Sequence, residues 1–128
     1  MFKNKKSTDK NSQHDIATRT LEKNDKIGIV CDEIVISIDK NEYCHKIADI
    51  VKIAILTTDK GPFVCDVFLL VAMKDCFIVL PSEHSLYEKF LFGDIAGNIS
   101  IDYHKIIEAS SCAENAEFVL YSKYNQKE

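Results

Sequence analysis

The segment from Phe63 to Met73 limits the folds open to this chain more than any other part of the sequence. Asp66 is its only charged residue, and the other side chains are apolar. Alternate side chains of a strand point to opposite faces, and here both faces are apolar. The segment is too short to cross a bilayer, which takes about 20 residues. It therefore predicts a central strand, covered on its second side by curvature of the sheet or by a second copy.

Strand patterns lie on both sides of this segment. Apolar residues alternate from Ile27 to Ile47, and the segments Ile50–Thr57 and Cys76–Leu80 are rich in β-branched or other apolar residues. Period-two alternation and β-branched runs are typical of strands. The connections are short, and short turns join antiparallel neighbours. The sequence predicts an antiparallel meander of about five strands.

Two short helices and a last strand are expected after Pro81. Ser82 or Ser85 can cap the first helix, and Gly93 is a suitable C-terminal stop. Asp102 can cap the second helix, whose inward face is expected to hold Tyr103, Ile106, Ile107 and Ser110. Residues 118–121 complete the pattern as a strand. The predicted class is α+β with a strongly curved sheet, a partial barrel or pleckstrin-homology-like arrangement.

Residues 1–26 differ from the rest of the chain. They carry seven basic and four acidic residues and few apolar ones, so they are expected to form a mobile polar tail. A single α+β domain is expected over residues 27–122, followed by a frayed end at 123–128. The tail contains no apolar stretch of the kind found in a secretory signal.

The cysteines indicate a reducing compartment. There are five, an odd number, at positions 31, 44, 65, 76 and 112, and no two are spaced as CxxC. A disulfide framework requires an even number in a secreted chain. The expected location is the cytoplasm, and neither a metal nor another cofactor is predicted.

The charge distribution argues against nucleic acid as a partner. Residues 27–128 hold nine basic and sixteen acidic residues, and Arg19 is the only arginine of the chain. Nucleic-acid-binding surfaces are basic and rich in arginine. The acidity suits a basic protein partner, or it serves solubility alone.

Seven residues are candidates for a binding site. Thr58, Asp59 and Lys60 lie in a loop before Phe63, which is either a simple hairpin turn or a binding loop held by the sheet. Asp66 is either paired near a strand end or a lone acid in a pocket. Glu83 and His84 stand beside two serines, where they either begin a helix or assist catalysis.

Several short motifs together resemble a group of small bacterial proteins with no established activity. The shared pattern reads "TTD-GPF-DVF", "IPSE" and a late "IEA", matched here around Thr57–Asp59, Gly61–Phe63, Asp66–Phe68, Ile78–Glu83 and Ile107–Ala109. The group places Trp near the positions of Leu69 and Tyr121, whereas this chain has no Trp. The resemblance implies a self-contained domain of a bacterial cytoplasm.

These observations favour a non-enzymatic binding module, for example an immunity-type protein that binds a basic partner. One alternative is a small enzyme or metal-binding protein that uses Asp66, His84 or His104. Another is a homodimeric structural protein, because the central strand is apolar on both faces. No membrane association is expected.

Overall fold

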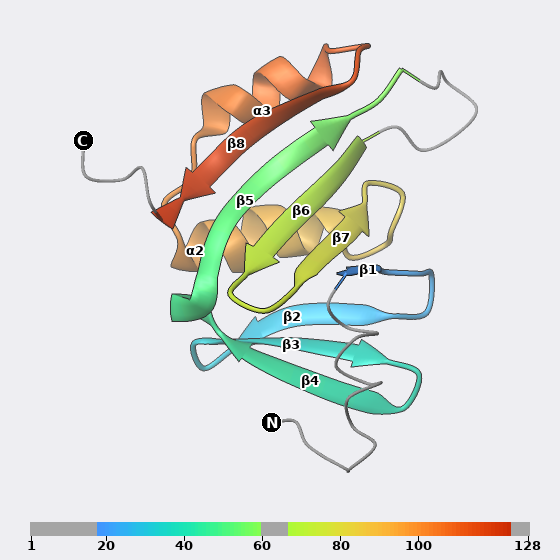
Figure 1. Ribbon diagram of the computed structural model, residues 1–128, viewed down its shortest axis with the longest axis vertical. Coiled ribbons are helices and arrows are strands. Elements are labelled where there is room, and N and C mark those ends of the chain that lie inside the picture. The colour runs from blue at the N-terminus through green and yellow to red at the C-terminus, as the bar shows by residue number, and fades with distance from the viewer. Residues whose placement is uncertain (1–17, 60–66, 124–128) are drawn as a thin grey trace.

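The computed structural model describes residues 18–59 and 67–123, which form an α+β fold with two separate sheets (Figure 1). This confirms the predicted class. Sheet A has five strands in the order β1-β7-β6-β5-β8, and sheet B has three in the order β2-β3-β4. The strands are β1 (Thr18–Thr20), β2 (Lys26–Val30), β3 (Glu33–Ile38), β4 (Asn41–Lys46), β5 (Ile50–Thr57), β6 (Val67–Met73), β7 (Phe77–Pro81) and β8 (Ala116–Ser122).

The described part of the apolar segment, residues 67–73, forms the central strand of sheet A, as predicted. Strand β6 lies between β5 and β7 and is antiparallel to both, with Leu69 opposite Ile55 on one side and Leu80 on the other. Strand β8 pairs with the far edge of β5. The buried side chains of these strands face a helix that lies behind the sheet in Figure 1.

Sheet B is a meander of two tight hairpins. Ile34, Ile36 and Ile38 alternate along β3 and are all buried, as the sequence pattern predicted. The turn between β2 and β3 contains Cys31 and Asp32 with φ of 52° and 66°. Two positive φ values suit a two-residue hairpin, because such a turn follows the twist of the strands.

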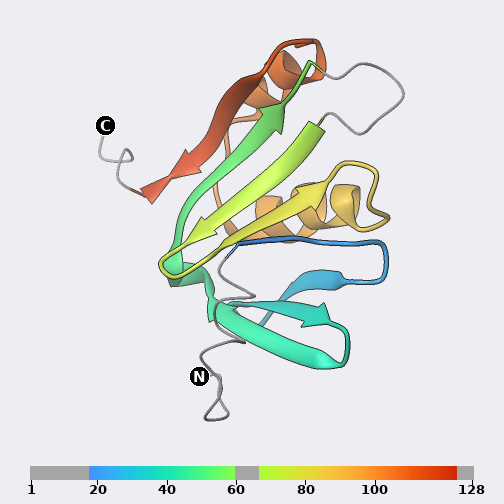
Figure 2. The same ribbon diagram turned by 45° about the vertical axis from the view of Figure 1, so that its right-hand side comes forward.

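The predicted partial barrel is not present, because the two sheets do not close on each other (Figure 2). A short 3₁₀ helix, η1 (Ile47–Asp49), separates β4 from β5. Strand β5 then has β6 on one edge and β8 on the other, so neither edge is free to pair with β4. Strand β5, which was expected to continue the meander after β4, therefore belongs to sheet A, while β4 stays in sheet B.

The first helix differs in length from the sequence prediction. It runs through η2 (Lys89–Ile95), a π-helical stretch, and continues as α2 (Ala96–Asn98). Gly93 therefore does not stop the helix. Hydrogen bonds from residue i to i+5 widen the helix, and this stretch buries Phe90, Leu91 and Ile95 against the core.

The second helix, α3 (Tyr103–Ser110), begins as predicted, because the Asp102 carboxylate accepts a hydrogen bond from the His104 N–H at 3.0 Å. Its predicted inward face is only partly correct. Ile106 is half-buried and packs against the core, whereas Tyr103 is 52 % exposed and Ile107 65 % exposed. The helix lies beside β8 at the edge of sheet A, which leaves one side of it in solvent.

The predicted polar tail over residues 1–26 is wrong for its last nine residues, while residues 1–17 lie outside the described part. Thr18–Thr20 forms β1, parallel to β7. Leu21 is buried in the core, and its N–H donates to the Val79 carbonyl at 2.8 Å. The domain therefore includes residues before Ile27, where it was expected to begin. Among the described residues, no helix is both long and apolar enough to cross a membrane.

Candidate functional site

The predicted site residues that can be placed lie at one end of sheet A. Strands β5 and β7 are both antiparallel to β6, so they run in the same direction and end on the same side. Thr58 and Asp59 follow β5, and Glu83 and His84 follow β7. Lys60, Phe63 and Asp66 lie outside the described residues.

The residues after β5 fasten this end of the sheet. The buried Thr57 hydroxyl donates to the Glu114 carbonyl at 2.6 Å, and the Asp59 N–H donates to Asn115 Oδ1 at 3.2 Å. These bonds tie the end of β5 to the turn before β8. The Thr58 hydroxyl is buried and has no hydrogen-bond partner among the described residues, and Asp59 is exposed.

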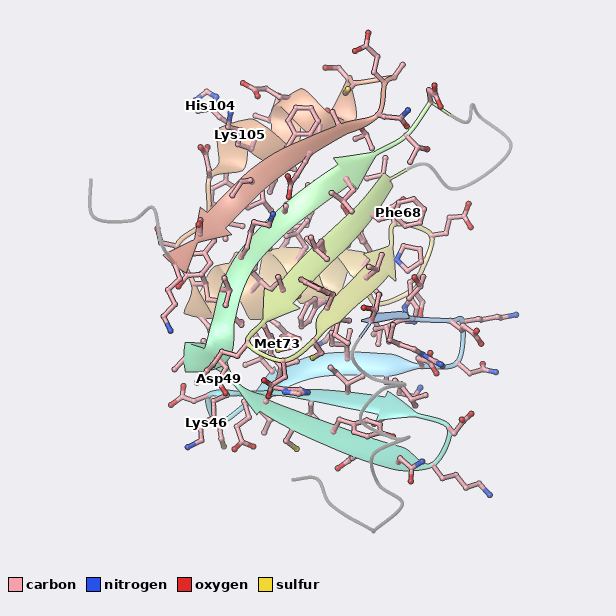
Figure 3. The ribbon with its side chains drawn as sticks, viewed as in Figure 1. Lys46, Asp49, Phe68, Met73, His104 and Lys105 are labelled. Atoms are coloured by element: carbon pink, nitrogen blue, oxygen red, sulfur yellow. The ribbon has the colours of Figure 1, made fainter. Side chains whose placement is uncertain are left out.

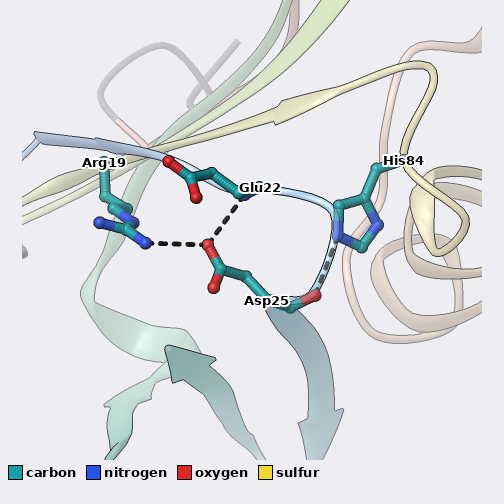
Figure 4. Close-up of polar contacts among 4 residues, drawn as sticks. All are labelled: Arg19, Glu22, Asp25 and His84. Atoms are coloured by element: carbon teal, nitrogen blue, oxygen red, sulfur yellow. Dashed lines mark hydrogen bonds and ion pairs between the residues drawn. The ribbon is translucent and has the colours of Figure 1, made fainter. Parts of the chain in front are cut away.

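His84 is held by two main-chain hydrogen bonds, of which the one to Asp25 is drawn in Figure 4. The Leu86 N–H donates to its Nδ1 at 3.0 Å, and its Nε2 lies 2.9 Å from the Asp25 carbonyl oxygen. Because a carbonyl can only accept, Nε2 donates this bond, while Nδ1 accepts the other. Neither nitrogen is free to take a proton from a substrate or to bind a metal. His84, rather than the predicted Ser85, satisfies the Leu86 N–H as the chain enters the helix.

The loop that His84 holds was not predicted as part of the site. Asp25 is buried, and its Oδ2 accepts hydrogen bonds from Arg19 Nη2 at 3.0 Å and the Glu22 N–H at 2.8 Å (Figure 4). The Asp25 N–H donates back to the Glu22 carbonyl at 2.9 Å, which closes a turn. The hydrogen bond to Asp25 also raises the pKa of the Arg19 guanidinium. The network fastens β1 and the β1–β2 loop to the turn after β7.

A hollow of about 470 Å³ lies beside this network. Its lining comes from the β1–β2 loop and from the turn after β7: Leu21, Lys23, Asn24, Pro81, Glu83, His84 and Ser85. Lys23 and Glu83 are exposed at its rim, and the two nitrogens of His84 are used by main-chain groups. The hollow has the size of a small-ligand site but contains no activated acid or base.

A second histidine lies close to a cysteine, also without the properties of a catalytic pair. His45 Nε2 is 3.8 Å from Cys76 Sγ. Burial raises the pKa of the Cys76 thiol to about 11, and burial lowers the pKa of His45 below its ordinary value of 6.5. A thiol with a raised pKa is a poor nucleophile. Neighbours in a strand point to opposite faces, and accordingly Cys44 is exposed whereas His45 is half-buried.

No cluster suited to a metal ion exists among the described residues, where no three His, Cys, Asp or Glu side chains come together for one. His104 is exposed on α3, at the opposite edge of sheet A from β1 (Figure 3). The enzyme alternative named Asp66, His84 or His104, and of these only the two histidines lie among the described residues.

The outer face of sheet A, here called the open face, is the most unusual surface of the described residues. No described helix or strand lies over it, and the two helices lie on the opposite side (Figures 1 and 2). Phe68 and Leu70 of β6 point to this face and are partly buried, while Phe77 of β7 is 47 % exposed. Curvature of the sheet was one of two coverings expected for the second side of β6, and among the described residues it does not cover that side. The other covering, a second copy, stays a prediction.

The strand register arranges the open face in three cross-strand rows. The first row is Thr18, Phe77, Ala72, Lys52 and Ser122; the second is Thr20, Val79, Leu70, Ala54 and Val119; the third is Pro81, Phe68, Leu56 and Glu117. The centre is apolar, and the polar residues lie toward the edges. The two charged residues, Lys52 and Glu117, form an ion pair of 2.6 Å.

The open face is also uneven in height. Ala54 is 0 % exposed and Ala72 is 5 % exposed, and each lies opposite a larger side chain on the neighbouring strand, Leu70 and Phe77 respectively. An apolar centre with a polar rim is the anatomy of a protein interface.

Comparison of the chain with family models, curated proteins and solved structures finds no match to any of them.

Proposed function

We propose that this chain is a non-enzymatic protein-interaction module that uses the open face of sheet A to bind a partner with an apolar, uncharged surface. The observation that carries the proposal is the group of nine apolar residues within the three rows of that face. Soluble proteins rarely expose contiguous apolar patches beyond a few hundred Å², and those that do commonly use them for binding.

The charge of the open face favours an uncharged partner over a basic one. The described residues carry sixteen acidic and ten basic side chains, a difference of six. On the open face itself, however, Lys52 and Glu117 neutralise each other. A basic partner, such as the immunity hypothesis requires, would find no net negative charge there.

The polar groups support a binding role rather than catalysis. His84 and Asp25 are used in main-chain hydrogen bonds that fix a loop, and Cys76 is buried as a protonated thiol. The proposal also places the chain in a reducing cytoplasm, as the resemblance to bacterial proteins suggests. Cys31 and Cys44 are free and exposed, and exposed thiols survive best in such a compartment.

Site-specific photocross-linking tests the proposal. A benzoyl-phenylalanine probe at Phe77 reports on the open face, and the same probe at Tyr103 provides a control of similar exposure, 47 % against 52 %. We expect protein adducts at position 77 that disappear when Leu70→Lys is added to the same face. Adducts no stronger at 77 than at 103, or unaffected by Leu70→Lys, would refute the proposal.

A further inference from the structure

We infer that the partner is a second copy of this chain, which packs its open face on the first around a two-fold axis that crosses the strands at the level of Leu70. This inference rests on the proposed function. Two copies that meet through the same surface must be complementary to themselves under the two-fold rotation. The three rows of the open face allow that condition to be tested residue by residue.

A two-fold rotation about an axis across the strands places each strand against the same strand of the other copy, running in the opposite direction. The second row then faces itself, and the first row faces the third. Within β6, Phe68 of one copy therefore faces Ala72 of the other, while Leu70 faces Leu70. A large side chain meets a small one at both ends of the strand, which is how packed sheets fill the space between them.

The same rotation also matches the charges. Lys52 lies in the first row on β5, and Glu117 lies in the third row on the neighbouring β8. After rotation, Lys52 of each copy lies over Leu56 of the other, next to the other copy's Glu117. Lys52 and Glu117, which pair within one copy, therefore also approach the oppositely charged side chain of the other copy.

The competing two-fold axis, parallel to the strands along β6, gives a poorer fit. It lays Phe68 on Phe68 and Ala72 on Ala72, so that one end is crowded and the other leaves a gap. It also sets Lys52 against Phe77, away from Glu117. The arrangement across the strands is therefore the one that the register supports.

The area of the open face predicts a weak dimer. Five strands about 4.8 Å apart and three rows about 6.8 Å apart make a face of about 24 Å by 20 Å, or roughly 500 Å² for each copy. Specific stable interfaces bury about 800 Å² on each side. We therefore expect a dissociation constant between about 10 µM and 1,000 µM.

Sedimentation equilibrium of the purified chain between 10 µM and 2 mM tests the inference. We expect a concentration-dependent dimer that Leu70→Lys weakens by about 100-fold, because the rotation brings the two lysines together. Tyr103→Lys, at an exposed aromatic residue outside the face, should leave the association unchanged. Circular dichroism checks that each variant remains folded.

A size exchange along β6 tests the axis itself. Phe68→Ala alone should weaken the dimer at least tenfold, and Phe68→Ala combined with Ala72→Phe should restore it, because each large side chain again meets a small one. Failure of a folded double variant to recover overturns the arrangement across the strands.

The two proposals fail in different ways. A wild-type chain that remains monomeric at 2 mM, while the probe at Phe77 forms adducts with another protein, overturns the second-copy inference and leaves the interaction module standing. A monomer whose probe at Phe77 forms no adduct overturns both.

Discussion

Replacing His84 by Ala should destabilise the fold, because His84 joins two loops rather than acting on a substrate. The substitution removes the bond from Leu86 N–H to Nδ1 and the bond from Nε2 to the Asp25 carbonyl. Each such bond contributes about 1 kcal/mol, and leaving partly buried main-chain groups without partners adds to the loss. We expect the free energy of unfolding to fall by about 2–3 kcal/mol. At about 3–5 °C per kcal/mol for a chain of this length, the Tm should fall by about 6–15 °C.

Urea and thermal unfolding followed by far-UV circular dichroism measure this effect, since the chain has no Trp to serve as a fluorescent probe. The matched control is His104→Ala, at an exposed histidine whose side chain makes no hydrogen bond or ion pair with any other described residue. This variant should stay within about 0.5 kcal/mol of the wild type. Equal stability of His84→Ala and His104→Ala would refute the structural role of His84.

Three further outcomes follow from the geometry. Cys31→Asn combined with Asp32→Gly should raise the free energy of unfolding by about 1 kcal/mol in urea titrations, because both positions have positive φ, which Asn and Gly tolerate best. A loss of stability would contradict the turn between β2 and β3. Burial lowers the pKa of His45, so the unfolded chain binds the proton more tightly than the folded chain does. The free energy of unfolding should therefore fall as the pH drops from about 7.5 through 6.5, and His45→Leu should flatten this dependence. Maleimide should label Cys31 and Cys44 rapidly and Cys76 slowly in native protein at pH 7.5, whereas comparable rates would show that Cys76 is accessible.

The central strand and most of its neighbours could be predicted because their signals are local. The apolar run that includes β6 and the alternation of Ile34, Ile36 and Ile38 depend on nearby residues alone. The cap at Asp102 likewise involves only the His104 N–H, two residues away. Local patterns of this kind reflect the pleat of a strand or the free N–H groups of a helix end.

The rest depended on contacts between distant segments. Strand β1 has only three residues, and its partner β7 lies almost sixty residues further along, so its polar sequence resembled a solvated tail. His84 bonds to Asp25 across the same separation. The continuation of the helix past Gly93 follows from burial of Phe90, Leu91 and Ile95, which outweighs the preference of glycine for a helix end.

Closure of the sheet was equally beyond local reasoning. The sequence showed that both sides of β6 are apolar, but curvature depends on which strands occupy the edges of β5. Because β8 occupies the second edge, the meander divides into two sheets, and no described element covers the outer side of β6. A second copy, one of the coverings that the sequence left open, is the partner that we propose for this side.

Isotope-filtered nuclear Overhauser measurements on a mixture of labelled and unlabelled chains at 1 mM detect the packing of one open face on another. We expect a contact between the Phe68 ring of one copy and the Ala72 methyl of the other, which lie at opposite ends of the same strand within one chain. Absence of any contact between copies on the open face, together with methyl shifts of Ala54 and Ala72 that do not change between 0.02 mM and 1 mM, would contradict it.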